Sequence, residues 1–136
     1  MMLDKLLGFG RILFPVSFLF YVGLHFGQPA VGASFIPSFI PFPLFLNYLT
    51  GGLILLFIVS CLLGRYDKLA TVLMALYVFL MILLVHIPRA GQSENDLLNI
   101  FRNLMTIGSL LVYAKYATKD PRLSFRAHQP RTQQTA

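Results

Sequence analysis

Residues 12–64 read ILFPVSFLFYVGLHFGQPAVGASFIPSFIPFPLFLNYLTGGLILLFIVSCLLG and contain no Lys, Arg, Asp or Glu. One membrane-crossing helix needs roughly 20 apolar residues, so this stretch is long enough for two. Across all 136 residues, hydrophobic residues make up 57% and charged residues 12%, whereas an average soluble domain has roughly 25% charged residues. The stretch therefore predicts an integral membrane protein.

Four segments of the chain are long and apolar enough to cross a bilayer: residues 8–27, 43–64, 69–87 and 97–116. Backbone amides in hydrocarbon must be paired within the segment, so each span is expected to be a helix. The sequence shows no strand-like alternation over lengths that would suit a barrel. We therefore predict an all-α membrane protein with four transmembrane helices in an antiparallel bundle.

The connector between the first two spans, SFIPSFIPFP at residues 34–43, combines three prolines with three phenylalanines and no charge. Gly27, Pro29 and Gly32 are expected to end the first helix, and Pro43 suits the first turn of the second. No ordinary helix continues through such a stretch. We expect an extended segment at the membrane face, with its phenylalanines at the lipid interface or over the end of the bundle.

The distribution of basic residues predicts the orientation of the spans. With four spans, the N-terminus, the middle loop and the C-terminal tail share one side, and the other side holds only Arg89 and Arg102. Lys and Arg concentrate on the cytoplasmic side of membrane proteins. We therefore expect both termini to be cytoplasmic, in a multi-pass protein of the bacterial cytoplasmic (inner) membrane. The residues on the basic side are Lys5, Arg11, Arg65, Lys68, Lys115, Lys119, Arg122, Arg126 and Arg131.

The first span has an alternative interpretation as a secretory signal peptide. Lys5 and Arg11 precede an apolar run, and the small residues of Val31-Gly32-Ala33 could form a cleavage site. The apolar run is long for a signal peptide, and its removal would place the basic middle loop and the basic tail on opposite sides of the membrane. The distribution of charge thus favours a retained first span.

The chain divides into a predicted transmembrane domain over residues 1–118 and a basic, flexible cytoplasmic tail over 119–136. The tail carries much of the net charge of +6, which suits contact with anionic lipid head groups. Nothing in it resembles a nucleic-acid-binding motif. Cys61 is the only cysteine, so it has no partner for an internal disulfide and is expected to be a small buried apolar residue.

Polar residues within the spans are the candidates for function, because such residues usually face the interior of a helix bundle. Six of them should lie at a similar depth toward the outer leaflet, near the outer ends of their spans. If their faces point inward, they line one polar pocket beneath the connector, which would cover it. These candidate ligand-binding residues are His25, Asn47, His86, Asn99, Arg102 and Asn103.

Other interpretations of the same residues are open. Arg102 could extend to the interface or join a structural hydrogen-bond network, and His25 and His86 could anchor helix ends. Two histidines on different helices could also clamp a b-type haem, although nothing else in the sequence supports one. Met74 and Met81 fit packing better than a metal site. The spans as predicted contain no carboxylate, so neither a proton relay nor a carboxylate metal site is expected.

Several motifs, taken in order, give the chain a resemblance to a known family. These are GRILFPVSFLFYVGLHF in the first span, IPSFIPFPLFLNYLTGGL after it, LLGRYDKLATVLMAL at the middle turn, VHIPRAG, and LLNIFRNLMTIGSLLVYA in the fourth span. Over residues 8–117 the chain resembles the DoxX-like membrane proteins. The resemblance implies a four-helix bundle in the cytoplasmic membrane, and some relatives are small subunits of quinone-linked sulfur-oxidising complexes.

The resemblance also implies roles for single residues. Arg11, His86, Arg102 and Asn103 occupy polar positions typical of the family. Many members carry a Glu in the second span about where this chain has Ile54. Loss of that acid argues against proton-coupled quinone chemistry, so no enzymatic activity of the protein on its own is expected.

Three functions follow from these patterns. The first is an accessory or assembly subunit of a larger membrane complex, such as a respiratory or redox complex, with other membrane subunits or further copies of the chain as partners within the bilayer. The second is a binder of a quinone or lipid-like ligand in the outer-leaflet polar pocket, with redox-linked activity. The third is a small transporter, for which Gly51-Gly52 is the single hint of a broken helix.

Overall fold

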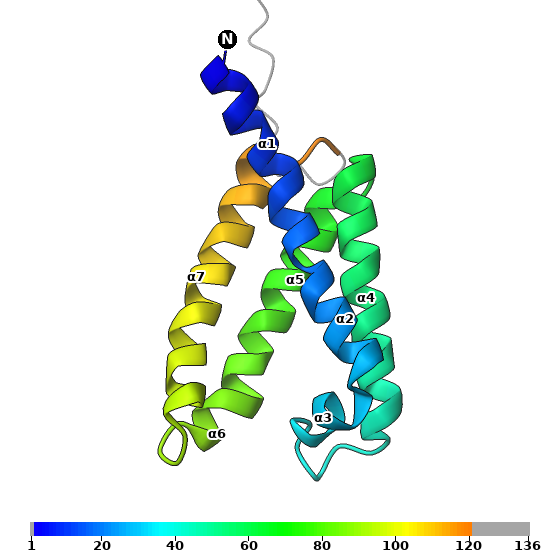
Figure 1. The fold of residues 1–136 in the computed structure, drawn as a ribbon, viewed down its shortest axis with the longest axis vertical. Coiled ribbons are helices and arrows are strands. Elements are labelled where there is room, and N and C mark those ends of the chain that lie inside the picture. Colours follow the sequence, from blue (N-terminus) through cyan, green and yellow to red (C-terminus); the bar gives the residue numbers. More distant parts are fainter. Residues whose placement is uncertain (1, 121–136) are drawn as a thin grey trace, which may run out of the picture.

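The computed structural model describes residues 2–120, and within that range every regular element is a helix (Figure 1). All but residues 119 and 120 of the predicted tail lie outside the described residues. In chain order the helices are α1 (Met2–Ser17), α2 (Leu19–Gly27), α3 (Pro29–Ser34), α4 (Pro43–Leu63), α5 (Asp67–Met81), the π-helix η1 (Ile82–His86), α6 (Ile87–Arg89) and α7 (Glu94–Tyr116).

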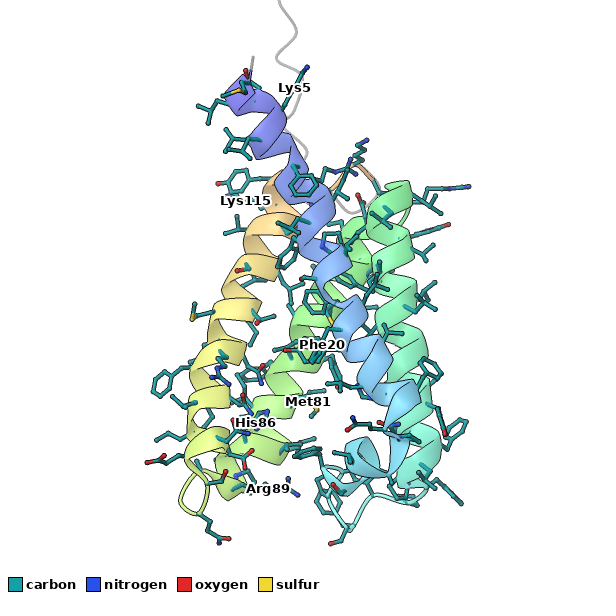
Figure 2. All side chains as sticks on the ribbon, in the orientation of Figure 1. Lys5, Phe20, Met81, His86, Arg89 and Lys115 are labelled. Atoms are coloured by element: carbon teal, nitrogen blue, oxygen red, sulfur yellow. The ribbon has the colours of Figure 1, made fainter. Side chains whose placement is uncertain are left out.

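Within residues 2–120, four helical stretches are long and apolar enough to cross a membrane: Met2–Gly27, Pro43–Leu63, Asp67–Arg89 and Glu94–Tyr116. The structure thus confirms the predicted all-helical class and the presence of four helical stretches with the length and composition of membrane spans. Three of the observed stretches begin two to six residues before the predicted spans, since turns rich in charged residues are still helical. Large apolar side chains are exposed along every stretch (Figure 2), as expected for surfaces that face lipid.

The first span is interrupted near its middle, where α1 gives way to α2. Pro15 lies inside α1 and has no amide proton, so the carbonyl of Arg11, four residues earlier, lacks its usual helical donor. The hydroxyl of Tyr113 in α7 donates to this carbonyl at 3.0 Å. The proline thus frees a backbone acceptor, and the last span supplies the donor.

The connector after the first span is more helical than predicted. Pro29 was expected to end the first helix, but it occupies the first turn of α3, where a missing amide proton is tolerated. Turns without regular structure then cover residues 35–42, and Phe39 and Phe42 are both largely exposed. The phenylalanines therefore point away from the protein.

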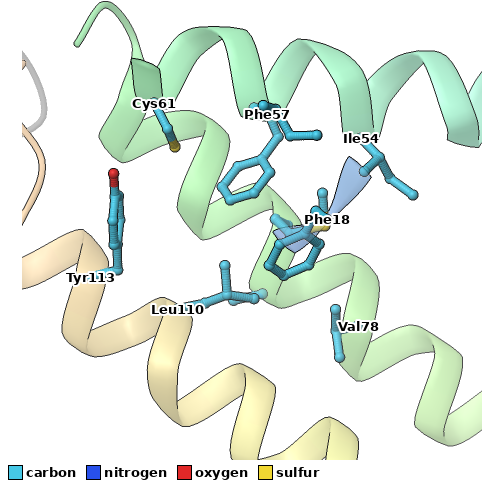
Figure 3. Packing of buried hydrophobic residues seen from close by; sticks show 10 residues of the cluster. Phe18, Ile54, Phe57, Cys61, Val78, Leu110 and Tyr113 are labelled. Carbon is cyan, nitrogen blue, oxygen red and sulfur yellow. The ribbon is translucent and has the colours of Figure 1, made fainter. Parts of the chain in front are cut away.

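The core lies where α2, α4, α5 and α7 meet (Figure 3). Helix α5 packs against both α4 and α7, while α2 and α3 pack against α4. The rings of Phe18 and Phe57 meet edge to face with centroids 5.2 Å apart, a favoured aromatic geometry. Leu110 is completely buried. The buried cluster consists of Phe18, Ile54, Phe57, Ile58, Cys61, Met74, Ala75, Val78, Leu110 and Tyr113.

The turns gather at two opposite ends of the molecule (Figure 1). At one end, the turn between α4 and α5 lies beside the segment that follows α7, because Gly64 is in contact with Lys119. At the other end, α3 approaches α6, and Arg89 donates to the carbonyl of Ser34 at 3.1 Å. Each end contains a group of buried polar side chains.

Candidate functional site

A cavity of about 170 Å³ lies between α2, α4, α5, η1 and α7, and we call it the histidine cavity. Two histidines and further polar groups line it together with apolar core residues. Figure 2 places His86 and Met81 in the lower half of the bundle, toward the end that carries α3 and α6. The lining residues are Phe18, Tyr21, His25, Ile54, Met74, Tyr77, Val78, Met81, His86, Asn103 and Thr106.

His25 reaches the cavity from α2 and is held from behind by Asn47 of α4. Its Nδ1 lies 2.6 Å from Asn47 Oδ1, and Asn47 Nδ2 donates to the carbonyl of His25 at 2.8 Å. Asn47 is almost completely buried and does not itself line the cavity. One amide side chain therefore holds both the backbone and the ring of His25.

Two glycines permit this close packing. A Cβ atom at Gly32 of α3 would overlap Asn47 Oδ1, and a Cβ atom at Gly51 of α4 would lie 2.8 Å from His25 Cβ. Both positions require glycine, because a Cβ atom at either one would lie closer to a neighbouring side-chain atom than non-bonded atoms approach in a packed protein. The glycines thus let α3 and α2 lie directly against α4.

His86 reaches the cavity from η1 and pairs with a carboxylate. Its Nδ1 lies 2.8 Å from Asp96 Oδ1, and both side chains are mostly buried. Asp96 stands in the first turn of α7, where its amide donates to Ser93 Oγ at 3.2 Å. This N-terminal cap fixes the turn that carries the carboxylate.

The six residues predicted for the pocket fall into three groups. His25, His86 and Asn103 line the histidine cavity, and Asn47 supports His25. Asn99 and Arg102 do not line it. Arg102 is exposed on α7, and its Nη1 donates to Asn99 Oδ1 at 3.4 Å. Asn99 and Asn103 share one face of α7, one turn apart, but the cavity reaches only Asn103.

The sequence analysis did not assign Tyr21, Tyr77, Thr106 or Asp96 to the site. The first three line the cavity, and Asp96 contacts His86. Asp96 was expected in a loop outside the span, whereas α7 already begins at Glu94. The spacing Ser93-x-x-Asp96 is a helix-capping signal that could have indicated the earlier start.

A second polar group lies at the opposite end, and we call Arg11, Cys61, Asp67, Thr71 and Tyr113 the Asp67 cluster. Asp67 is completely buried. Its carboxylate accepts hydrogen bonds from the amides of Lys119 at 2.6 Å and Asp120 at 3.0 Å. The sequence analysis did not single out Asp67, because the residue falls in the basic middle loop between the predicted spans.

Arg11 completes the charge balance of the Asp67 cluster. Its Nη2 lies 3.9 Å from Asp67 Oδ2, and its Nε donates to the carbonyl of Ala117 at 2.9 Å. Thr71 lies one helical turn after Asp67 and donates to the carbonyl of Asp67, while Cys61 Sγ lies 3.6 Å from Thr71 Oγ1. These contacts join α1, α4 and α5 to the end of α7.

A larger apolar groove of about 500 Å³ runs between α4 and α5. Three of its residues, Ile54, Met74 and Tyr77, also line the histidine cavity. A thin wall of shared side chains therefore separates the polar cavity from the groove. Its other lining residues include Leu53, Leu56, Leu69, Leu73, Leu76 and Leu80.

The geometry limits the cofactors that the cavity can hold. An apolar cavity of about 150 Å³ accommodates one benzene ring, so a space of about 170 Å³ is enough for a single small ring. Within residues 2–120, no three His, Cys, Asp or Glu side chains are grouped in a way that could hold a metal ion. The space suits one small polar ring or head group.

The histidine cavity thus combines two oriented imidazoles with amide and hydroxyl groups inside an apolar helix bundle. Comparisons of the chain with protein-family models, curated proteins and solved structures find no match.

Proposed function

We propose that the protein binds an amphipathic membrane ligand, quinone- or lipid-like, whose polar head group occupies the histidine cavity. The observation that carries this proposal is the convergence of His25, His86 and Asn103 on one cavity of about 170 Å³. Ligand sites typically combine an apolar lining with a few converging polar groups. In a bilayer such groups are retained mainly where they bind something or pair with one another.

The groove between α4 and α5 is the proposed place for the hydrocarbon chain of the ligand. It shares Ile54, Met74 and Tyr77 with the histidine cavity, and its lining is almost wholly apolar. Movement of these side chains would join the two spaces. A head group could then enter from the lipid without crossing the water phase.

The membrane setting of this proposal is an antiparallel bundle in the bacterial inner membrane with both termini in the cytoplasm. The bias of Lys and Arg toward the N-terminus, the middle loop and the tail supports this orientation. It places the histidine cavity toward the outer leaflet. The resemblance to DoxX-like proteins fits a ligand of this kind and remains part of the proposal.

The proposed role is binding without catalysis by the isolated protein. Ile54 lines the cavity at the position where the resembling family often has Glu, so no acid of the second span reaches the ligand. The carboxylate of Asp96 contacts His86 instead of lining the cavity. Any redox-linked step would need a partner subunit.

A second candidate function, an accessory subunit of a larger membrane complex, is favoured by Arg102. This residue is exposed on α7, roughly 12 Å along the helix from Glu94 at 1.5 Å per residue. An arginine facing lipid near the centre of a span costs about 2.5–3.5 kcal/mol. Contact with an acidic or polar group of another membrane subunit would remove this cost.

The ligand proposal is tested by native mass spectrometry of protein extracted gently from its own membrane, followed by analysis of the released small molecules. We expect one amphipathic molecule per chain. Thr106→Phe should abolish its retention, since it fills the cavity. Ser109→Phe is the matched control. Ser109 lies on the same helix as Thr106, and the hydroxyl of each residue donates to the carbonyl four residues earlier. Unlike Thr106, Ser109 does not line the cavity. Equal retention by both variants would refute the proposal.

A further inference from the structure

The two histidines of the cavity share a feature that ligand binding alone does not require: each ring is held at Nδ1 from outside the cavity. Asn47 holds His25 at 2.6 Å, and Asp96 holds His86 at 2.8 Å. Neither Asn47 nor Asp96 lines the cavity. The nitrogen of each ring that is left for a ligand is therefore Nε2.

The contacts of Asn47 fix the proton on His25. Asn47 Nδ2 donates to the carbonyl of His25, so Asn47 Oδ1 is the atom that faces the ring and can only accept a hydrogen bond. The proton of the neutral imidazole must then be on Nδ1, and Nε2 is left as an acceptor.

Asp96 acts on His86 in the same way. A carboxylate accepts the Nδ1 proton, and the capped first turn of α7 keeps that carboxylate in place. The π-helical turn η1 carries His86, and such turns occur frequently at functional sites. In the neutral ring, Nε2 of His86 is again an acceptor.

Thr106 adds a third acceptor to the same wall. Its hydroxyl proton is donated to the carbonyl of Arg102 at 3.0 Å, so the lone pairs of its oxygen remain for a ligand. Within residues 2–120, the structure gives neither histidine Nε2 a hydrogen-bonding partner. The cavity therefore presents three fixed acceptors, Nε2 of each histidine and the oxygen of Thr106, beside the side chains of Asn103, Tyr21 and Tyr77, which can also donate.

From this arrangement we infer that the histidine cavity selects an aromatic diol that carries a hydrocarbon chain. The two hydroxyl groups of such a ring are the donors. Asn47 and Asp96 are the positioning residues, because each holds one histidine ring in the orientation that accepts a hydroxyl. The inference rests on the proposed function and narrows its ligand class. A carbonyl-bearing ring of the same size could accept from Asn103, Tyr21 or Tyr77, but it would leave Nε2 of both histidines without a donor. Sites built to bond a hydroxyl discriminate strongly against analogues that lack it.

The test measures binding of three probes to full-length protein in nanodiscs at pH 8: 2-decylhydroquinone kept reduced under nitrogen, 2-decyl-1,4-benzoquinone, and 2-decyl-1,4-dimethoxybenzene. We expect the diol to bind at least about tenfold more tightly than the other two. Equal affinities for the three probes would overturn the inference and leave the proposed function standing. No binding of any probe, together with no ligand in gently extracted protein, would overturn both.

A second measurement reads the protonation of the two histidine rings directly. Nitrogen-15 spectra of the histidine rings distinguish a protonated from an unprotonated ring nitrogen, and His25→Gln and His86→Gln assign the signals. We expect protonated Nδ1 and unprotonated Nε2 in both rings of the protein without ligand. An unprotonated Nδ1 in either ring would overturn the inference.

Variants of Asp96 separate positioning from general stability. Asp96→Ala should lower the affinity for the diol about tenfold, and the affinity for the quinone by less than about threefold. In this variant the proton of neutral His86 should be found on Nδ1 in some molecules and on Nε2 in others. Glu94→Gln is the control, because Glu94 lies in the same helical turn and is exposed. An equal loss for all probes in Asp96→Ala would show a structural role only and would overturn the assignment of Asp96.

Discussion

The Asp67 cluster and the histidine cavity are both buried polar regions of a largely apolar bundle, yet their hydrogen bonds are arranged differently. In the Asp67 cluster, the carboxylate is completely buried and accepts from the amides of Lys119 and Asp120. In the histidine cavity, each ring is held on one side and borders open space on the other. Polar groups that pair with one another hold a fold together, whereas groups left facing a cavity are available to a ligand.

The largest effect is expected from breaking the Asp67 cluster. Asp67→Ala removes the charge partner of Arg11 and the buried acceptor of three backbone amides, and removal of one partner of a buried ion pair typically destabilises by about 3–5 kcal/mol. The free energy of unfolding in mixed detergent micelles measures this loss.

Two further variants sharpen that result. Asp67→Asn keeps one acceptor oxygen and should lose less stability than Asp67→Ala. Glu94→Ala, at an exposed acidic position, should change the free energy of unfolding by less than about 0.5 kcal/mol. If Asp67→Ala were as stable as Glu94→Ala, the cluster would not be a structural clamp.

The next effect is expected where α2 packs on α4. Gly51→Ala would place a Cβ atom 2.8 Å from His25 Cβ, so the helices must separate, at a cost of about 1–3 kcal/mol. Gly52→Ala is the matched control, because a Cβ atom there meets no atom within 4 Å. It should be neutral or stabilise the helix by up to about 1 kcal/mol. Thermal unfolding compares the two, and similar melting temperatures would contradict the close packing.

A smaller effect on the fold, but a clear one on binding, is expected at Asn103. Asn103→Leu removes a polar group from the lining of the histidine cavity, and loss of one hydrogen bond to a ligand should weaken binding about tenfold, or about 1.4 kcal/mol. Stability should change by less than about 1 kcal/mol. Asn99→Leu, four residues earlier and outside the lining, should retain wild-type binding in a titration with the ligand released from native protein.

The smallest effect on the isolated protein is expected at Arg102. Its side chain is exposed and its described hydrogen bond, to Asn99, is long at 3.4 Å, so Arg102→Leu should not destabilise the protein and should leave ligand retention unchanged. Affinity purification from native membranes then separates the two candidate functions. Loss of co-purifying membrane subunits in Arg102→Leu would support the accessory role, and an unchanged set would argue against a contact through this arginine.

Much of the site was visible in the sequence as a set of polar residues at helical spacing, and three of the six predicted residues do line one cavity: His25, His86 and Asn103. Arg102 is exposed, and Asn99 lies one turn before Asn103 on the same helix but outside the lining. Helical periodicity shows which side chains of one helix point in the same direction. It does not show which face of that helix packs against the neighbouring helices. A single turn of α7 therefore contains both a lining and an exposed residue.

The sequence by itself determined the membrane class and the number of spans, because the length of an uncharged apolar run is a local property that needs no knowledge of packing. It also located three of the polar residues that line the histidine cavity. Only the tertiary structure decided which of them meet, since the burial of Asp67 depends on amides more than fifty residues away. The pairing of Asp96 with His86 likewise depends on where α7 begins relative to η1. Partners of buried polar groups are set by contacts between distant segments, and no local pattern records those contacts.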